Sequence, residues 1–178
     1  MIVRLAYGRG TLDVELPREA ATVITPSHRP GLADERAAVF RALDAPIGAA
    51  ALRARVTPEC RITIVHTDIT RPTPNDRLIP WILAYLEDAG ARRENVTLLN
   101  ALGTHRPNTR AELEQMLTPA VVANYACVNH EPENDEAHVQ FGVTSGGAPA
   151  LINRHLAHAD IRIVTGFVEP HFFAGFSG

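Results

Sequence analysis

The sequence contains no lysine, because all 17 of its basic residues are arginine. Neither a Schiff base nor a lysine nucleophile can therefore come from these 178 residues. Cysteine is also scarce: Cys60 and Cys127 lie far apart, without Cys-x-x-Cys spacing, and are expected to be buried thiols in a reducing compartment. Aromatic residues make up only 6% of the chain, so its apolar content is mostly aliphatic, as expected where helices pack on a sheet.

The chain also lacks a strong excess of charge. Its 17 basic and 20 acidic residues give a formal net charge of −3, which offers no field suited to a nucleic-acid backbone or an anionic membrane. The opening MIVRLAYGRG has no apolar signal-peptide core, and no apolar run is long enough to span a bilayer. We therefore expect a cytoplasmic protein with neither nucleic acid nor membrane as a partner.

The length and patterning predict a single α/β domain over residues 1–178. Residues 2–7 and 11–16 alternate apolar and polar residues around Gly8-Arg9-Gly10, which predicts a β-hairpin. Beyond it, strand and helix patterns alternate, as in a Rossmann-like, largely parallel sheet with flanking helices. The strands are expected at 61–67, 95–101, 126–129, 138–143 and 161–166; the helices at 33–43, 75–89 and 110–117, with a short one from Thr118-Pro119 and a helical or irregular segment near 151–159.

Polar residues follow three of the expected strands. Asp68-Ile69-Thr70-Arg71 follows the first, Gly103-Thr104-His105 follows the second, and Glu169-Pro170-His171 follows the last. Ligands of parallel α/β sheets bind beyond the carboxyl ends of the strands, so these groups are expected to face one site. Each group alone also has a structural explanation: a turn cap, a surface charge, or a hydrogen bond to the loop backbone.

The remaining histidines give little indication of a functional site. His66 lies inside an expected strand and is predicted to be packed in the interior. His155 and His158 have an i, i+3 spacing, but nothing near them supplies the further ligands of a zinc site. We expect structural or solvated roles for these three side chains.

At the strand ends the sequence resembles the nickel-pincer-nucleotide lactate racemase family. The resemblance rests on YGRGTLDVELP (7–17), PIG (46–48), DITRPTP (68–74), GTHRP (103–107), VNH (128–130), INR (152–154) and GFVEPHFFAGFSG (166–178), which occur in the family's order. It implies an N-terminal catalytic α/β domain of a longer two-domain enzyme, whose C-terminal domain completes the cleft. It also implies a racemase or epimerase acting on a small 2-hydroxy acid.

The resemblance assigns roles to particular residues. His105 and His171 match the two catalytic histidines, and Asp68, Ile69, Thr70 and Arg71 match the cofactor-binding segment. Arg71 would also hold the substrate carboxylate, to which a forked guanidinium is suited. The implied cofactor is a nickel-bearing pyridinium nucleotide, to which hydride is transferred while a histidine takes the hydroxyl proton.

The chain departs from the family in one respect. The lysine that family members attach to the cofactor, and the later histidine that binds nickel, have no counterparts in these residues. We therefore expect the chain alone to be inactive and to contribute no metal ligand. A non-catalytic domain that binds a nucleotide or carboxylate remains an alternative, and so does a metal-dependent hydrolase that uses His105 and His171 as ligands.

Overall fold

The computed structural model describes residues 1–25, 27–171 and 175–177 of the chain. Contacts divide it into two compact units, Met1–Ala33 and Asp34–Gly178. The first unit contains the antiparallel hairpin of β1 (Ile2–Tyr7) and β2 (Gly10–Glu15), joined by a turn in which Gly8 has a φ of +55°. The expected hairpin is therefore confirmed.

The second unit is built around a sheet of four parallel strands in the order β5-β4-β3-β8. Its strands are β3 (Ile62–Thr67), β4 (Val96–Ala101), β5 (Ala126–Asn129) and β8 (Ile161–Val164). Its helices are α1 (Glu35–Asp44), α2 (Asn75–Asp88), α3 (Arg110–Leu117), α4 (Pro119–Asn124) and α5 (Arg154–Ala157), with 3-10 turns at Leu52–Ala54, Arg93–Asn95 and Asp135–Ala137. The predicted α/β class and parallel pairing are confirmed.

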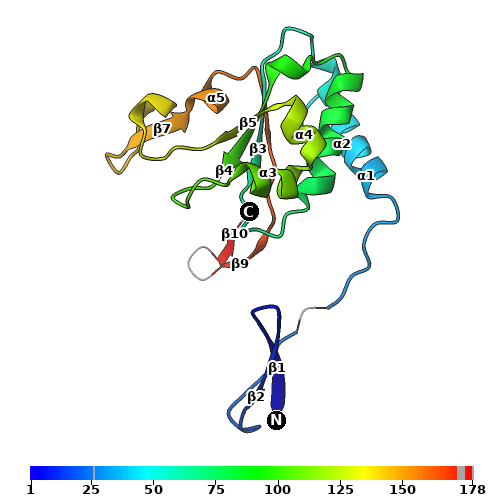
Figure 1. Ribbon diagram of the computed structural model, residues 1–178, viewed down its shortest axis with the longest axis vertical. Coiled ribbons are helices and arrows are strands. Elements are labelled where there is room, and N and C mark those ends of the chain that lie inside the picture. Colours follow the sequence, from blue (N-terminus) through cyan, green and yellow to red (C-terminus); the bar gives the residue numbers. More distant parts are fainter. Residues whose placement is uncertain (26, 172–174, 178) are drawn as a thin grey trace. The chain divides into compact units, whose positions relative to one another are not determined.

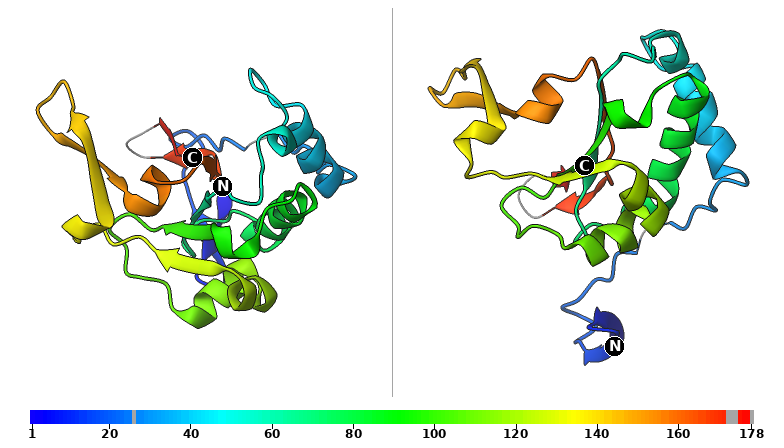
Figure 2. Two further views of the ribbon diagram at one scale, coloured as in Figure 1. Left: turned by 90° about the horizontal axis from the view of Figure 1, so that it is seen from above. Right: turned by 45° about the horizontal axis from the view of Figure 1, so that its top comes forward.

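One face of this sheet carries the hydrophobic core. Alternate residues of a strand point to opposite faces, and Ile62 and Ile64 of β3 pack with Leu98 of β4 beneath the helices. Helices α2, α3 and α4 supply the other side of this core, including the fully buried Leu86 and Leu117. In Figures 1 and 2 helices α1 to α4 gather on one side of the sheet, and α5 lies on the other.

The segment before β8 differs from expectation. Residues 138–143 do form a strand, β6 (His138–Val143), but it pairs with β7 (Pro149–Asn153) in a separate antiparallel hairpin. The helical or irregular segment expected near 151–159 is helical only at α5. The reason is the turn Thr144-Ser145-Gly146-Gly147: Gly147, with a φ of +84°, reverses the chain and brings β7 back along β6.

The strand order places a switch point between β3 and β8. The chain runs from β3 through β4 to β5 in one direction, then returns to place β8 on the other side of β3. The first four strands of a doubly wound dinucleotide-binding fold have this order, and ligands bind in the crevice where the direction reverses. A short antiparallel pair, β9 (Glu169–His171) and β10 (Gly175–Ser177), follows β8.

Candidate functional site

A cavity lies at this switch point, beyond the carboxyl ends of β3, β4 and β8. Its volume is about 410 Å³, within the range of small-molecule pockets. Its lining includes Asp68 and Arg71 after β3, His105 after β4, and Thr165 and Phe167 after β8. Two of the three predicted loops therefore converge on one cavity, and the segment after β8 lines it as well.

Asp68 and His105 form a hydrogen-bonded pair in this cavity. His105 Nδ1 lies 2.8 Å from Asp68 Oδ2, and Thr70 Oγ1 donates to Asp68 Oδ1 at 2.7 Å. An ionised carboxylate can only accept, so Nδ1 carries the proton of this hydrogen bond and Nε2 is left for another partner. The Asp68 side chain is only 5% exposed, whereas the His105 side chain is 51% exposed. The half-exposed imidazole of His105 is therefore held in orientation by the buried carboxylate of Asp68.

The pKa of Asp68 reflects the same contacts. Burial alone raises it, but the hydrogen bonds from His105 and Thr70 outweigh burial, so the pKa lies below its ordinary value. Asp68 is therefore ionised at neutral pH. The structural explanation of Asp68 and Thr70 as a turn cap is incomplete, because the carboxylate also holds the His105 ring.

The loop that carries His105 is fixed at both ends. Gly103 has a φ of +59°, a left-handed conformation that favours glycine, so the chain turns directly after β4. On the other side, Arg106 forms a bidentate ion pair with Glu112. Its Nη1 donates to Oε2 at 2.9 Å, and its Nη2 donates to Oε1 at 2.6 Å. Glu112 also forms a capping box with Thr109 at the start of α3: Thr109 Oγ1 accepts from the backbone N–H of Glu112, and the Glu112 carboxylate accepts from the backbone N–H of Thr109. The pKa of Glu112 is strongly lowered, chiefly by Arg106.

Three asparagines, of which Asn100 and Asn108 are buried, connect this loop to the sheet. Asn100, at the end of β4, donates to the side-chain oxygens of Asn108 and Asn129, both at 2.8 Å. Asn108 accepts from the backbone N–H of Ile69 at 3.4 Å, and Asn129 donates to the backbone oxygen of Asn108. The network therefore ties together the loops after β3, β4 and β5.

Arg71 faces the segment after β8. Its Nη1 lies 3.3 Å from Oε1 of Glu169, with the two side chains 38% and 28% exposed. Glu169 and His171 both belong to β9, and residues two apart on a strand project to the same side. The Arg71–Glu169 ion pair therefore tethers the strand that carries His171. Residues 172–174 and 178 of the predicted motif lie outside the described residues.

The sequence did not predict several of these contacts. Glu169 was expected to face the site, with an ordinary turn as the alternative, but its ion pair with Arg71 was not anticipated, and neither was the asparagine network. A sequence signal did exist for Asn100, a polar residue at the end of the otherwise apolar strand pattern VTLLNA. Ile69 was expected to bind cofactor. In the structure its backbone N–H is engaged by Asn108, and it packs partly against the core.

Other predictions concern metal and membrane. In residues 1–25, 27–171 and 175–177, no group of three or more His, Cys, Asp or Glu side chains is arranged to hold a metal ion. No helix in this described part combines the length and apolar character needed to cross a bilayer. His66 is fully buried, as predicted, and burial lowers its pKa. Cys60 and Cys127 are free thiols, but they are only partly buried.

Comparison with known proteins supports the pattern seen at the strand ends. The family model described as the lactate racemase N-terminal domain matches residues 7–178. A lactate racemase from Thermoanaerobacterium thermosaccharolyticum is 33% identical over 180 aligned residues, covering 99% of this chain and 42% of the relative. One from Lactiplantibacillus plantarum is 37% identical over 144 residues, covering 81% of this chain and 34% of the relative. The chain thus spans less than half the length of these relatives.

Solved structures show the same similarity. The lactate racemase apoprotein of Thermoanaerobacterium thermosaccharolyticum superposes with a TM-score of 0.82 at 32% identity, covering 100% of this chain and 42% of that one. A Thermotoga maritima protein shares the fold with a TM-score of 0.62 at 23% identity, covering 80% of this chain and 35% of that one.

Proposed function

Because the chain belongs to the lactate racemase family, as its N-terminal domain, we propose that it supplies the acid–base half of a racemase or epimerase site for a 2-hydroxy acid. The observation that carries this proposal is the Asp68–His105 pair at the switch-point cavity. A reversible proton transfer near neutral pH requires an accessible imidazole nitrogen in a fixed tautomer, supported by a carboxylate. His105 and the buried Asp68 supply these groups.

His105 is the proposed general base for one enantiomer. Its Nδ1 is committed to Asp68, which leaves Nε2 to accept the proton of the substrate hydroxyl and later to return it. The buried carboxylate also stabilises the imidazolium that forms during the transfer, as in other carboxylate–histidine pairs. We assign the same task for the opposite enantiomer to His171, on β9.

Arg71 is the proposed substrate anchor. Its guanidinium lines the cavity and can bind a carboxylate through two parallel hydrogen bonds. Glu169 already occupies one of these N–H groups at 3.3 Å. The carboxylate of a bound 2-hydroxy acid would therefore compete with Glu169 or share Arg71 with it.

The cofactor proposed from the family is the nickel-pincer nucleotide. The cavity volume of about 410 Å³ suits part of a mononucleotide. Arg71, which lines the cavity, and Thr70, the residue before it, would hold the cofactor. When bound, this group supplies the hydride acceptor that turns the 2-hydroxy acid into a planar 2-keto acid. Both carboxylate oxygens of Asp68 already accept hydrogen bonds, from His105 and from Thr70. Asp68 would therefore act on the cofactor indirectly, by holding these two side chains in place.

The rest of the site is proposed to come from a C-terminal domain, as the length of the relatives indicates. The identity of the 2-hydroxy acid depends on that domain as well. For the same reason we propose that the 178-residue chain alone does not turn over substrate.

The proposal can be tested in a chimera. This chain would replace the matching part of the Thermoanaerobacterium thermosaccharolyticum lactate racemase, which the close superposition makes feasible. The chimera, loaded with cofactor, is assayed for racemisation of lactate, malate and an aryl lactate. We expect turnover of at least one substrate, with a loss of about 10²- to 10⁴-fold in kcat for His105→Gln and for His171→Gln.

The matched control is His28→Gln, which alters an exposed histidine of the first unit. A chimera that binds cofactor and substrate without racemising any of the three would overturn the proposal. That outcome would favour the alternative of a binding domain without chemistry.

A further inference from the structure

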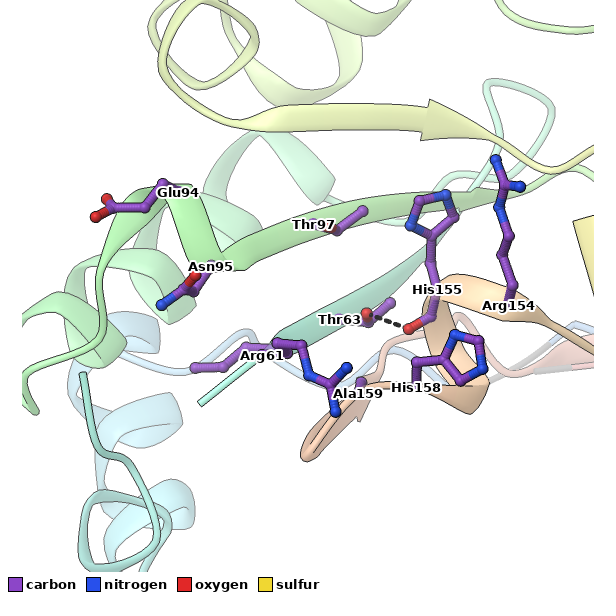
Figure 3. Close-up of a pocket in the computed structure, with 10 residues that line it drawn as sticks. Arg61, Thr63, Glu94, Asn95, Thr97, Arg154, His155, His158 and Ala159 are labelled. Atoms are coloured by element: carbon purple, nitrogen blue, oxygen red, sulfur yellow. Dashed lines mark hydrogen bonds between the residues drawn. The ribbon is translucent and has the colours of Figure 1, made fainter. Parts of the chain in front are cut away.

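A second cavity lies at the opposite end of the same sheet. Its volume is about 490 Å³, and its floor is formed near the amino ends of β3 and β4, where Thr63 and Thr97 lie. Its wall is formed by α5 and the residues that follow it: Arg154, His155 and His158 (Figure 3). None of these residues lines the switch-point cavity, so the two sites are separate.

The wall is fixed in place by backbone contacts. Thr63 Oγ1 donates to the backbone oxygen of His155 at 2.9 Å, which joins α5 to β3. The backbone N–H of His155 donates to Oδ1 of Asn153, a residue that is only 9% exposed. The His155 side chain is therefore carried by a short helix anchored to the sheet on one side and to β7 on the other.

The cavity is rich in donors that have no acceptor. Within the described part of the chain, the side chains of Arg154, His155 and His158 make no hydrogen bond and no ion pair. A neighbouring cation, Arg61, is already neutralised by Asp160, with Nε and Oδ2 3.4 Å apart. The one carboxylate among the described lining residues is that of Glu94, which lies at the far end of the cavity from the histidines (Figure 3).

The pKa of His155 reflects its basic surroundings. Partial burial lowers the pKa of His155, and the charges of Arg154 and His158 lower it further. The His155 imidazole therefore lies beside two other basic side chains in a half-open cavity. An anion bound beside it would favour the charged imidazole and could accept hydrogen bonds from the neighbouring basic side chains.

We propose that this cavity binds the phosphate group of a small molecule, held by Arg154, His155 and His158. A phosphate fits better than a carboxylate, because the donors belong to three separate side chains of one cavity and a phosphate presents three acceptor oxygens with a charge near −2. A planar carboxylate would be satisfied by a single guanidinium. The site lies at the end of the strands remote from the proposed racemase chemistry, so it is independent of that function.

The test is a titration of the isotopically labelled 178-residue chain, followed by nuclear magnetic resonance. Inorganic phosphate is added at constant ionic strength, with chloride as the balancing anion. We expect saturable shifts of the His155 and Ala159 amide signals, and a rise in the pKa of His155 on saturation. Glycerol phosphate, titrated in parallel, tells whether a phosphate ester binds as well as the free ion or better.

Two variants and one control identify the donors. Arg154→Gln and His155→Gln should each weaken phosphate binding about tenfold or more, because each removes a charge-assisted hydrogen bond. Arg9→Gln removes the same charge from the hairpin of the first unit and should leave binding unchanged. All variants should keep the dispersed amide spectrum of the wild-type chain.

Three results would overturn the proposal. These are phosphate shifts no larger than those caused by chloride, equal affinity in wild type and in Arg154→Gln, and shifts centred on Arg71 and His105. The last of these would assign phosphate to the switch-point cavity instead.

Discussion

Replacing Asp68 with asparagine tests the pair on which the proposed chemistry depends. The substitution keeps the size of the side chain but removes the charge that accepts from His105 at 2.8 Å and from Thr70 at 2.7 Å. The Asp68 side chain is 5% exposed, so solvent cannot replace these contacts. Hydrogen bonds to a charged group contribute about 1.5–3 kcal/mol, and a neutral amide retains part of that. We expect the free energy of unfolding at pH 7 to fall by about 1–2 kcal/mol.

The contribution of Asp68 to the free energy of unfolding is expected to depend on pH. The pKa of Asp68 is lower in the folded chain than in the unfolded one, so its contribution is complete above the unfolded value of about 3.9 and is lost as the pH falls through the folded value. Urea unfolding of wild type and Asp68→Asn at several pH values between about 5 and 2.5 measures the difference. The difference should shrink with acid. A difference that stays constant over this window would refute the reasoning.

A double-mutant cycle separates the pair from its surroundings. Asp68→Asn and His105→Gln are combined, and the coupling is the part of the effect that does not add. Coupling of about 0.5 kcal/mol or more is expected for residues in direct contact. Thr70→Ala serves as the matched comparison, because it removes the other hydrogen bond to Asp68.

Four further predictions follow from other contacts. Leu86→Ala removes a fully buried side chain of α2 and should cost about 2–5 kcal/mol in urea unfolding. Thr109→Ala breaks the capping box and should cost about 1 kcal/mol; an unchanged unfolding midpoint would show that Arg106 alone holds the turn. His66 is neutral in the folded chain because burial lowers its pKa, so stability should decline as the pH falls below about 6.5, less steeply in His66→Asn. Glu169→Gln should lower the KM for the 2-hydroxy acid in the chimera, because the carboxylate no longer competes for Arg71; an equal or higher KM would argue against that competition.

The sequence predicts the central elements of the fold well. The strand beginning at Ile62 and the helix beginning at Asn75 have clear apolar periodicity, and Pro72 and Pro74 mark where the helix cannot yet start. The capping residues Thr109 and Glu112 fix another helix start. These signals are local, because the residues that decide each element lie within it.

The parts that escaped prediction depend on distant residues. The strand β7 forms because a glycine-containing turn folds it against β6, and its own composition resembles the start of the following helix. The Arg71–Glu169 pair joins residues 98 positions apart, and only the placement of β8 beside β3 brings them together. The resemblance to lactate racemases predicted a role for His105, but its hydrogen bond with Asp68 is visible only in three dimensions.

The pairing of β8 with β3 also determines how such a domain can change. The cavity exists because β8 pairs on the far side of β3 through backbone hydrogen bonds, to which the Thr165 hydroxyl adds one bond to the Val65 oxygen at 3.0 Å. Exchanging Phe167, which lines the same cavity, would therefore alter the shape offered to a ligand without moving the Asp68–His105 pair. Under the proposed function, selectivity and chemistry would be carried by different strands: substitutions on the β8 side would change the substrate, while the Asp68–His105 pair stays constant.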